Sequence, residues 1–116
     1  RDIEASVIKR LSRLKNTIIS TGGGAVLREE NMTNLRKNGL IICLTASPET
    51  ILKRTSNNSS RPLLQVENPL QKIKELLEFR RPYYEKADIM IDTENKSPFE
   101  VAEEIIQKTK DRLRDC

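Results

Sequence analysis

Hydrophobic positions along the chain follow two spacings in turn, and this alternation predicts an α/β fold. Apolar residues at three- and four-residue steps, together with capping residues, predict helices over 2–14, 30–37, 47–54, 68–85 and 97–113. Short runs rich in apolar and β-branched residues predict strands over 17–20, 40–44 and 87–92. Strands that alternate with helices favour a parallel sheet with flanking helices, which binds ligands at the carboxyl ends of its strands.

Local signals mark several helix ends. Three helices are expected to begin at a capping side chain followed by proline, at Ser47-Pro48, Asn68-Pro69 and Ser97-Pro98. Gln71 and Glu100 stand three residues after the last two caps, where a capping-box partner belongs. Asn38-Gly39 is expected to end the second helix, with Gly39 in the left-handed conformation. The strand over 40–44 is apolar on both faces, which predicts an interior strand that is covered on both sides.

Three consecutive glycines, Gly22, Gly23 and Gly24, follow the β-branched run at 17–20. Glycine accepts positive φ and lets a ligand approach backbone N–H groups, and a helix that starts nearby adds the positive end of its dipole. We therefore expect a ligand site at the carboxyl end of this strand. The alternative interpretation is a flexible turn.

Three arginines stand at marked positions. Arg61 lies in the irregular segment 56–66, which is long enough to predict a lid loop, although Arg61 could be a plain exposed residue of that loop. Arg80 shares a helix face with apolar residues and needs an anionic or backbone partner, which could also be a structural ion pair or solvent at the edge of the face. Arg54 ends a helix, where the helix dipole alone favours a cation.

Composition narrows the function classes. The 116 residues, 36% of them hydrophobic, fit one domain over 1–116. The net charge of +4 comes from 21 basic and 17 acidic residues that interleave along the helices, and the chain has no Trp, two Phe and two Tyr. A nucleic-acid-binding module would cluster its charge and supply stacking aromatics, so we expect no nucleic-acid partner. No apolar stretch has the length of a membrane span, so we expect no membrane partner either.

Cysteine and histidine content bears on disulfides, metal sites and the compartment. Cys43 lies in an apolar run and Cys116 is the last residue, which gives no disulfide framework, and the absence of His argues against a metal site within this chain. We expect a soluble protein of a reducing compartment.

Arginines that face a glycine-lined backbone suit an anionic substrate and a reaction that develops charge on phosphoryl oxygens.

The chain resembles shikimate kinase at five motifs that occur in the family's order and with similar spacing over nearly the whole sequence. They are Arg1-Asp2-Ile3-Glu4, Gly22-Gly23-Gly24, Arg61-Pro62-Leu63-Leu64, Arg80-Arg81-Pro82-Tyr83-Tyr84 and Asp92-Thr93. The resemblance implies a P-loop fold like that of nucleoside monophosphate kinases. It also implies transfer of the γ-phosphate of ATP, with Mg²⁺, to the 3-hydroxyl of shikimate by a monomeric cytoplasmic enzyme, or a plastid enzyme if the source is a plant.

The resemblance also implies roles for individual residues. Arg1 and Arg80 would hold the shikimate carboxylate, for which the planar guanidinium is suited. Gly22, Gly23 and Gly24 would approach the substrate ring, Gly23 most directly. Arg61 would neutralise the transferring phosphoryl group as the lid closes and so counts as both catalytic and nucleotide-binding. Arg54 would lie on the adenine side, near the loop 92–98.

The sequence departs from the family pattern in ways that bear on activity. With four glycines in all, it holds no G-x-x-x-x-G-K-[ST] motif, so the phosphate loop, its lysine and the magnesium-binding hydroxyl are missing. The family's upstream aspartate pair and the phenylalanine before Arg1 are also missing, and Tyr83 replaces a commoner leucine. We expect the chain to be the distal part of a longer kinase, to lack the first strands of the sheet and to have no kinase turnover alone. The alternatives are another kinase of the same fold, such as a gluconate kinase, and a non-catalytic substrate-binding fragment.

Overall fold

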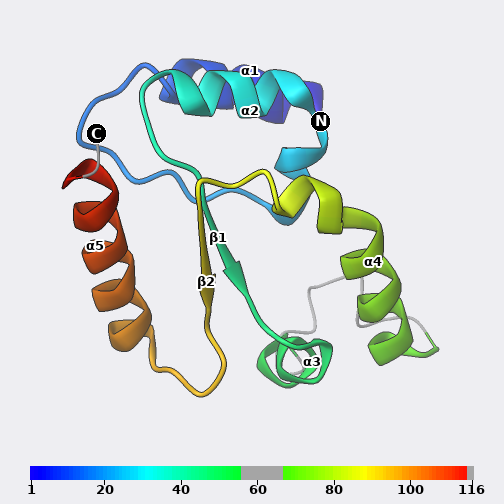
Figure 1. Cartoon of the computed structure of the whole chain (residues 1–116). Coiled ribbons are helices and arrows are strands. Elements are labelled where there is room, and N and C mark those ends of the chain that lie inside the picture. Colours follow the sequence, from blue (N-terminus) through cyan, green and yellow to red (C-terminus); the bar gives the residue numbers. More distant parts are fainter. Residues whose placement is uncertain (56–66, 115–116) are drawn as a thin grey trace.

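The computed structural model of the chain describes residues 1–55 and 67–114, and Figure 1 shows their arrangement. The elements in chain order are α1 (Asp2–Leu11), the short 3₁₀ helix η1 (Gly23–Leu27), α2 (Glu29–Lys37), β1 (Ile42–Thr45), α3 (Pro48–Thr55), α4 (Pro69–Tyr84), β2 (Ile89–Asp92) and α5 (Pro98–Arg114). The predicted lid over 56–66 lies outside the described residues. None of the helices within the described residues is long and apolar enough to cross a membrane.

β1 and β2 pair in parallel, with Ile42 opposite Ile89 and Thr45 opposite Asp92. Helices lie around this sheet: α1 and α2 run side by side, α5 lies along β2, and α3 follows the carboxyl end of β1 (Figure 1). The α/β prediction of a parallel sheet with flanking helices is confirmed. The main core forms where α5 meets the sheet, at Ile42, Ile89, Ile91, Val101 and Ile105.

Cover on both faces was predicted for the strand over 40–44, and this prediction is wrong for the described residues. Leu44 stays 54% exposed, although its register partner Ile91 is fully buried on the same face of the sheet. α5 packs against β2 and the core reaches β1 at Ile42, whereas Leu44 near the end of β1 is left uncovered by the described residues. Cys43, on the opposite face, is half-buried, and burial raises the pKa of its thiol.

The strand predicted over 17–20 is also absent. These residues run without a ladder partner among the described part of the chain, and Ile18 is 97% exposed. A β-branched run favours a pleated, half-buried surface but does not create one without a neighbouring strand. The glycines therefore follow an irregular segment instead of the carboxyl end of a strand.

The helix ends agree with the predicted caps in three places. Ser47 Oγ accepts from Thr50 N at 3.2 Å, and Asn68 Oδ1 accepts from Gln71 N at 3.3 Å. Ser97 and Glu100 form a complete capping box, because each side chain accepts from the other residue's backbone N–H, at 3.1 and 3.0 Å. The bond from the Ser97 backbone N–H is the largest cause that holds the pKa of Glu100 below its usual value.

Two other helix ends differ from the prediction in part. α1 stops at Leu11, three residues early, and the chain turns through Asn16, whose φ is 55°. Gly39 does not adopt the left-handed conformation, since no described glycine has positive φ. The end of α2 itself lies where it was predicted, with Lys37 as its last residue and Asn38 as its C-cap. Asn38 Nδ2 donates to Ser12 O at 3.2 Å, which ties the end of α2 to the end of α1.

Candidate functional site

Residues 22–24, here called the glycine turn, lead into η1, with Gly22 as its N-cap at φ −69° and ψ 156°. Because none of the three glycines has positive φ, the backbone conformation alone does not require them. The space around two of them is tight, since a Cβ placed on Gly23 or Gly24 would meet an arginine guanidinium from another part of the chain, whereas a Cβ on Gly22 would make only an ordinary contact. The glycine turn is therefore a place where arginine side chains of this chain approach the backbone closely, and the expectation of positive φ is wrong.

Arg1 lies against Gly24. A Cβ at Gly24 would be 2.6 Å from Arg1 Cζ and 2.8 Å from Arg1 Nη1, far inside van der Waals contact. Arg1 Nη1 donates to Glu4 Oε1 at 2.8 Å, one turn further along α1. Glu4 also reaches the glycine turn, with Oε2 3.7 Å from a Cβ placed on Gly22. The Glu4 carboxylate thus holds the Arg1 guanidinium over the turn.

Arg80 reaches the same turn from α4. A Cβ at Gly23 would lie 3.1 Å from Arg80 Nη1 and 3.0 Å from Tyr84 Oη. Arg80 Nη1 donates to Tyr84 Oη at 3.3 Å, and Tyr84 Oη donates to Gly23 O at 3.2 Å. Arg80 Nε is buried, and the described residues offer it no hydrogen-bond partner. The structure therefore brings Arg1, Arg80 and the three glycines together.

Side-chain hydrogen bonds from Asn31 and Arg28 hold the elements around the glycine turn. Asn31, only 1% exposed, donates from Nδ2 to Ala25 O at 2.9 Å and so fixes η1 on α2. Arg28 Nη2 donates to Asp2 Oδ1 at 2.9 Å, which links the start of α2 to the start of α1. This hydrogen bond from Arg28 lowers the pKa of Asp2. These contacts hold the helix that carries Arg1 beside the glycine turn.

Arg54 belongs to a second cluster, at the carboxyl end of the sheet. Its Nη1 donates to Thr93 Oγ1 at 2.7 Å and its Nη2 to Thr93 O at 2.8 Å. Thr93 Oγ1 donates to Thr45 O at 2.8 Å, at the end of β1. The structure therefore places Arg54 against the loop 92–98, as predicted, and fastens that loop to the sheet.

Glu94 fastens the same loop to the other end of α3. Its carboxylate accepts from Ser47 N at 2.6 Å and from Thr50 Oγ1 at 2.8 Å. The bond from the Ser47 backbone, followed by that from Thr50, lowers the pKa of Glu94. Since Arg54 contacts the loop from the carboxyl end of α3, both ends of this helix are held by two neighbouring residues, Thr93 and Glu94.

Three of these contributors were missed from the sequence. Tyr84 entered only as part of a family motif, and no role was predicted for Glu94 or Asn31. A tyrosine four residues after an arginine on one helix face could have suggested the Arg80–Tyr84 contact. No pattern in the sequence signals the bond of Glu94 to Ser47, 47 residues away, or the bond of Asn31 to Ala25, six residues away. Arg61 lies outside the described residues.

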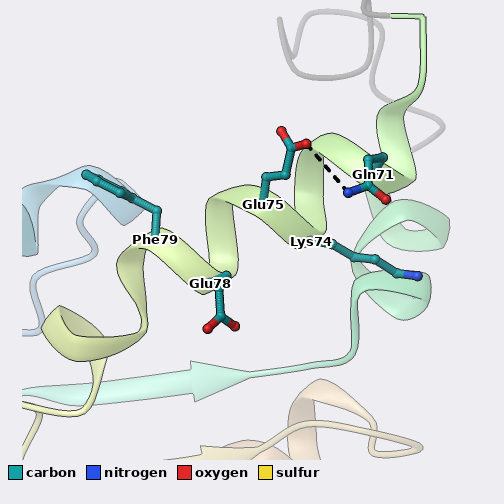
Figure 2. Close-up of a pocket in the computed structure, with 5 residues that line it drawn as sticks. All are labelled: Gln71, Lys74, Glu75, Glu78 and Phe79. Carbon is teal, nitrogen blue, oxygen red and sulfur yellow. Dashed lines mark hydrogen bonds between the residues drawn. The ribbon is translucent and has the colours of Figure 1, made fainter.

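A surface hollow on α4 is not part of this site. Its lining residues come from α4 alone, and Figure 2 shows their side chains spreading in different directions, with Glu75 and Glu78 on opposite sides of the helix. Gln71 Nε2 donates to Glu75 Oε1 at 3.5 Å across its rim. Polar groups do not converge there, and none of the predicted site residues lines it. In residues 1–55 and 67–114, no group of three or more His, Cys, Asp or Glu side chains could hold a metal ion.

Known proteins similar to this chain point to one family. The family model described as shikimate kinase matches residues 1–110. Among curated proteins, the chain is 56% identical over 108 residues to the shikimate kinase of Thermodesulfovibrio yellowstonii, and 51% identical over 107 residues to that of Caldanaerobacter subterraneus subsp. tengcongensis. These matches cover 93% and 92% of this chain but 62% and 63% of the two relatives. Both relatives are bacterial, which lends no support to a plastid.

Solved structures agree. The shikimate kinase from Acinetobacter baumannii in complex with shikimate matches with a TM-score of 0.87 at 35% identity, over 94% of this chain and 62% of that one. The shikimate kinase from Bacteroides thetaiotaomicron matches with a TM-score of 0.78 at 25% identity, over 97% of this chain and 66% of that one. The chain thus spans 62–66% of the length of these four relatives.

Proposed function

The chain belongs to the shikimate kinase family, and we propose that it supplies the shikimate-side site of an enzyme that transfers the γ-phosphate of ATP to the 3-hydroxyl of shikimate. The observation that carries this proposal is the approach of Arg1 and Arg80 to the same glycine turn. The similar kinase from Acinetobacter baumannii was solved in complex with shikimate, which supports the same substrate for this chain.

The charge balance at the turn favours a bound carboxylate. Arg1 shares its charge with Glu4, whereas Arg80 has the neutral Tyr84 as its hydrogen-bond partner and no carboxylate within 4 Å among the described residues. Two guanidiniums and one carboxylate leave an excess positive charge beside backbone groups that carry no side chain. A planar substrate carboxylate would neutralise it, and guanidiniums bind carboxylates through paired, charge-assisted hydrogen bonds.

The nucleotide side of the proposal is Arg54 with the loop 92–98. Arg54 and Thr93 contact each other, and the resemblance assigns this loop to the adenine of ATP. Arg61 is proposed from the resemblance alone to neutralise the transferring phosphoryl group.

The chain is also proposed to have no kinase turnover by itself. Mg²⁺, bound together with ATP, would offset the charge that develops on the phosphoryl group. The sequence holds no phosphate-loop lysine or adjoining hydroxyl, and its described residues hold no metal-binding cluster. These residues do not fit the metal, so no step through magnesium is assigned to this chain.

Calorimetric titration of the chain with shikimate and with gluconate tests the substrate assignment. Shikimate should bind more tightly, and Arg80→Ala should weaken its binding at least tenfold. Arg81→Ala is the matched control, because Arg81 is exposed one position further along α4 and pairs with Glu78 at 2.7 Å. Tighter binding of gluconate, or equal losses in the two arginine variants, would contradict the proposal.

A kinase assay tests the second statement. The chain with ATP, Mg²⁺ and shikimate should form no shikimate 3-phosphate above the uncatalysed background. Turnover at rates of about 1–100 s⁻¹, which are typical of kinases, would contradict it.

A further inference from the structure

The phenol of Tyr84 joins the two halves of the candidate site. Its Oη accepts from Arg80 Nη1 at 3.3 Å and donates to Gly23 O at 3.2 Å, so a single hydroxyl connects α4 to the glycine turn. Tyr84 and Arg80 are four residues apart on one helix and therefore share a face. The hydroxyl can fill both roles because it is at once a donor and an acceptor.

Tyr84 is the one hydrogen-bond partner that the described residues offer to the Arg80 side chain. Arg80 Nε is buried, and among the described residues it has no hydrogen-bond partner. No carboxylate of these residues lies within 4 Å of the Arg80 guanidinium. A long arginine side chain has many rotamers, and a bond at Nη1 removes much of that freedom. The phenol therefore determines where the guanidinium points.

The neutrality of this partner matters. A carboxylate in the place of Tyr84 would hold Arg80 equally well but would compete with an anionic ligand for its charge. The phenol orients the guanidinium and leaves the charge available. Gly23 completes the arrangement, because a Cβ there would lie 3.0 Å from Tyr84 Oη and 3.1 Å from Arg80 Nη1.

We propose that Tyr84 is a positioning residue that acts through Arg80, fixing the guanidinium for the carboxylate group of the substrate. This inference rests on the proposed function, which gives Arg80 a carboxylate to bind. Tyr84 itself is not proposed to contact the atoms that react.

The matched pair Tyr84→Phe and Tyr83→Phe tests the inference on the full chain. Each variant removes one hydroxyl from the same helix turn, but Tyr83 contacts Phe79 and Lys86 through its ring. The dissociation constant of shikimate should rise about 2- to 13-fold in Tyr84→Phe, because the variant loses the orientation of Arg80 but keeps its charge. It should stay unchanged in Tyr83→Phe.

Two comparisons separate positioning from a general structural role. The methyl ester of shikimate has no carboxylate, so its affinity should be the same for Tyr84→Phe and the unsubstituted chain. In an Arg80→Ala background, Tyr84→Phe should have no further effect on shikimate binding. An equal loss of ester affinity, or an additive loss in the double variant, would overturn the inference.

A substrate-free measurement distinguishes failure of the inference from failure of the proposed function. The Nε–Hε resonance of Arg80 in a ¹⁵N NMR spectrum should shift and exchange faster with water in Tyr84→Phe but not in Tyr83→Phe. An unmoved resonance would overturn the positioning role alone. Failure of the unsubstituted chain to bind shikimate would overturn the proposed function, and with it the purpose assigned to Tyr84.

Discussion

Replacing Gly24 by alanine should separate substrate binding from folding. The new Cβ would lie 2.6 Å from Arg1 Cζ and 2.8 Å from Arg1 Nη1, so the Arg1 side chain has to leave its place over the glycine turn. The obstacle is the far end of a flexible side chain, and it can move without displacing backbone.

The expected cost in stability is small. Moving Arg1 breaks its partly exposed pair with Glu4, and such pairs contribute about 0.2–1 kcal/mol. Gly24 does not have positive φ, so alanine also lowers the entropy of the unfolded chain, which stabilises by about 0.4–1 kcal/mol. The two effects oppose each other, and the free energy of unfolding should change by less than about 1 kcal/mol.

The expected cost in binding is larger. A hydrogen bond to a charged group contributes about 1.5–3 kcal/mol, so loss of the Arg1 contact should raise the dissociation constant of shikimate about 10- to 150-fold. Calorimetric titration measures the binding, and urea unfolding measures the stability.

Gly39→Ala is the matched control. It is a glycine whose Cβ would lie 3.4 Å from Leu35 O, away from any arginine, and it should leave shikimate binding unchanged. Shikimate binding by Gly24→Ala within twofold of the unsubstituted chain would refute the reasoning. A loss of binding that accompanies a stability loss above about 2 kcal/mol would show instead that the glycine is needed for folding.

Three further predictions concern stability. Hydrogen bonds hold the pKa of Glu94 below its usual value of about 4.3, so their stabilisation is present above that pH and is lost as the pH falls through the lowered pKa. Glu94→Gln should therefore make the free energy of unfolding depend less on pH between pH 7 and 3. Glu103→Gln, on the exposed face of α5, should leave this dependence unchanged, and identical curves for the two variants would count against the role of Glu94. Ile91→Val should cost about 0.5–1.5 kcal/mol by urea unfolding because Ile91 is fully buried, and the same change at Ile106, which is 55% exposed, should cost less than about 0.5 kcal/mol; equal losses would contradict the core assignment. Ser97→Ala should cost about 1 kcal/mol by the same measurement, since it removes the cap on Glu100 N, and an unchanged midpoint would show that the capping box contributes nothing.

Features with local causes were the ones predictable from the sequence. The Ser97–Glu100 capping box is formed by residues three apart, and its geometry follows from the start of any helix. The prediction of a strand at 17–20 was wrong, because a strand needs a neighbouring strand that no local pattern specifies. The position of the α2 end at Asn38-Gly39 was predictable, whereas the conformation of Gly39 and the bond from Asn38 to Ser12, 26 residues away in sequence, were not.

The site follows the same division. The motif spacing, read through the resemblance, placed Arg1, Arg80 and the glycines in one site, and the structure brings these residues together. The groups that orient them were not predictable, because Tyr84 contacts Gly23 across 61 residues and Glu94 contacts Ser47 across 47. Such side-chain bonds depend on the packing of whole elements.

The double attachment of α3 has a dynamic consequence. An isolated helix of eight residues is too short to be stable in water, and its ends fray first. Here Thr93 binds Arg54 near one end and Glu94 binds Ser47 and Thr50 at the other, so neither end can open alone. The helix and the loop should exchange their amide hydrogens as one cooperative unit, with protection rising and falling together.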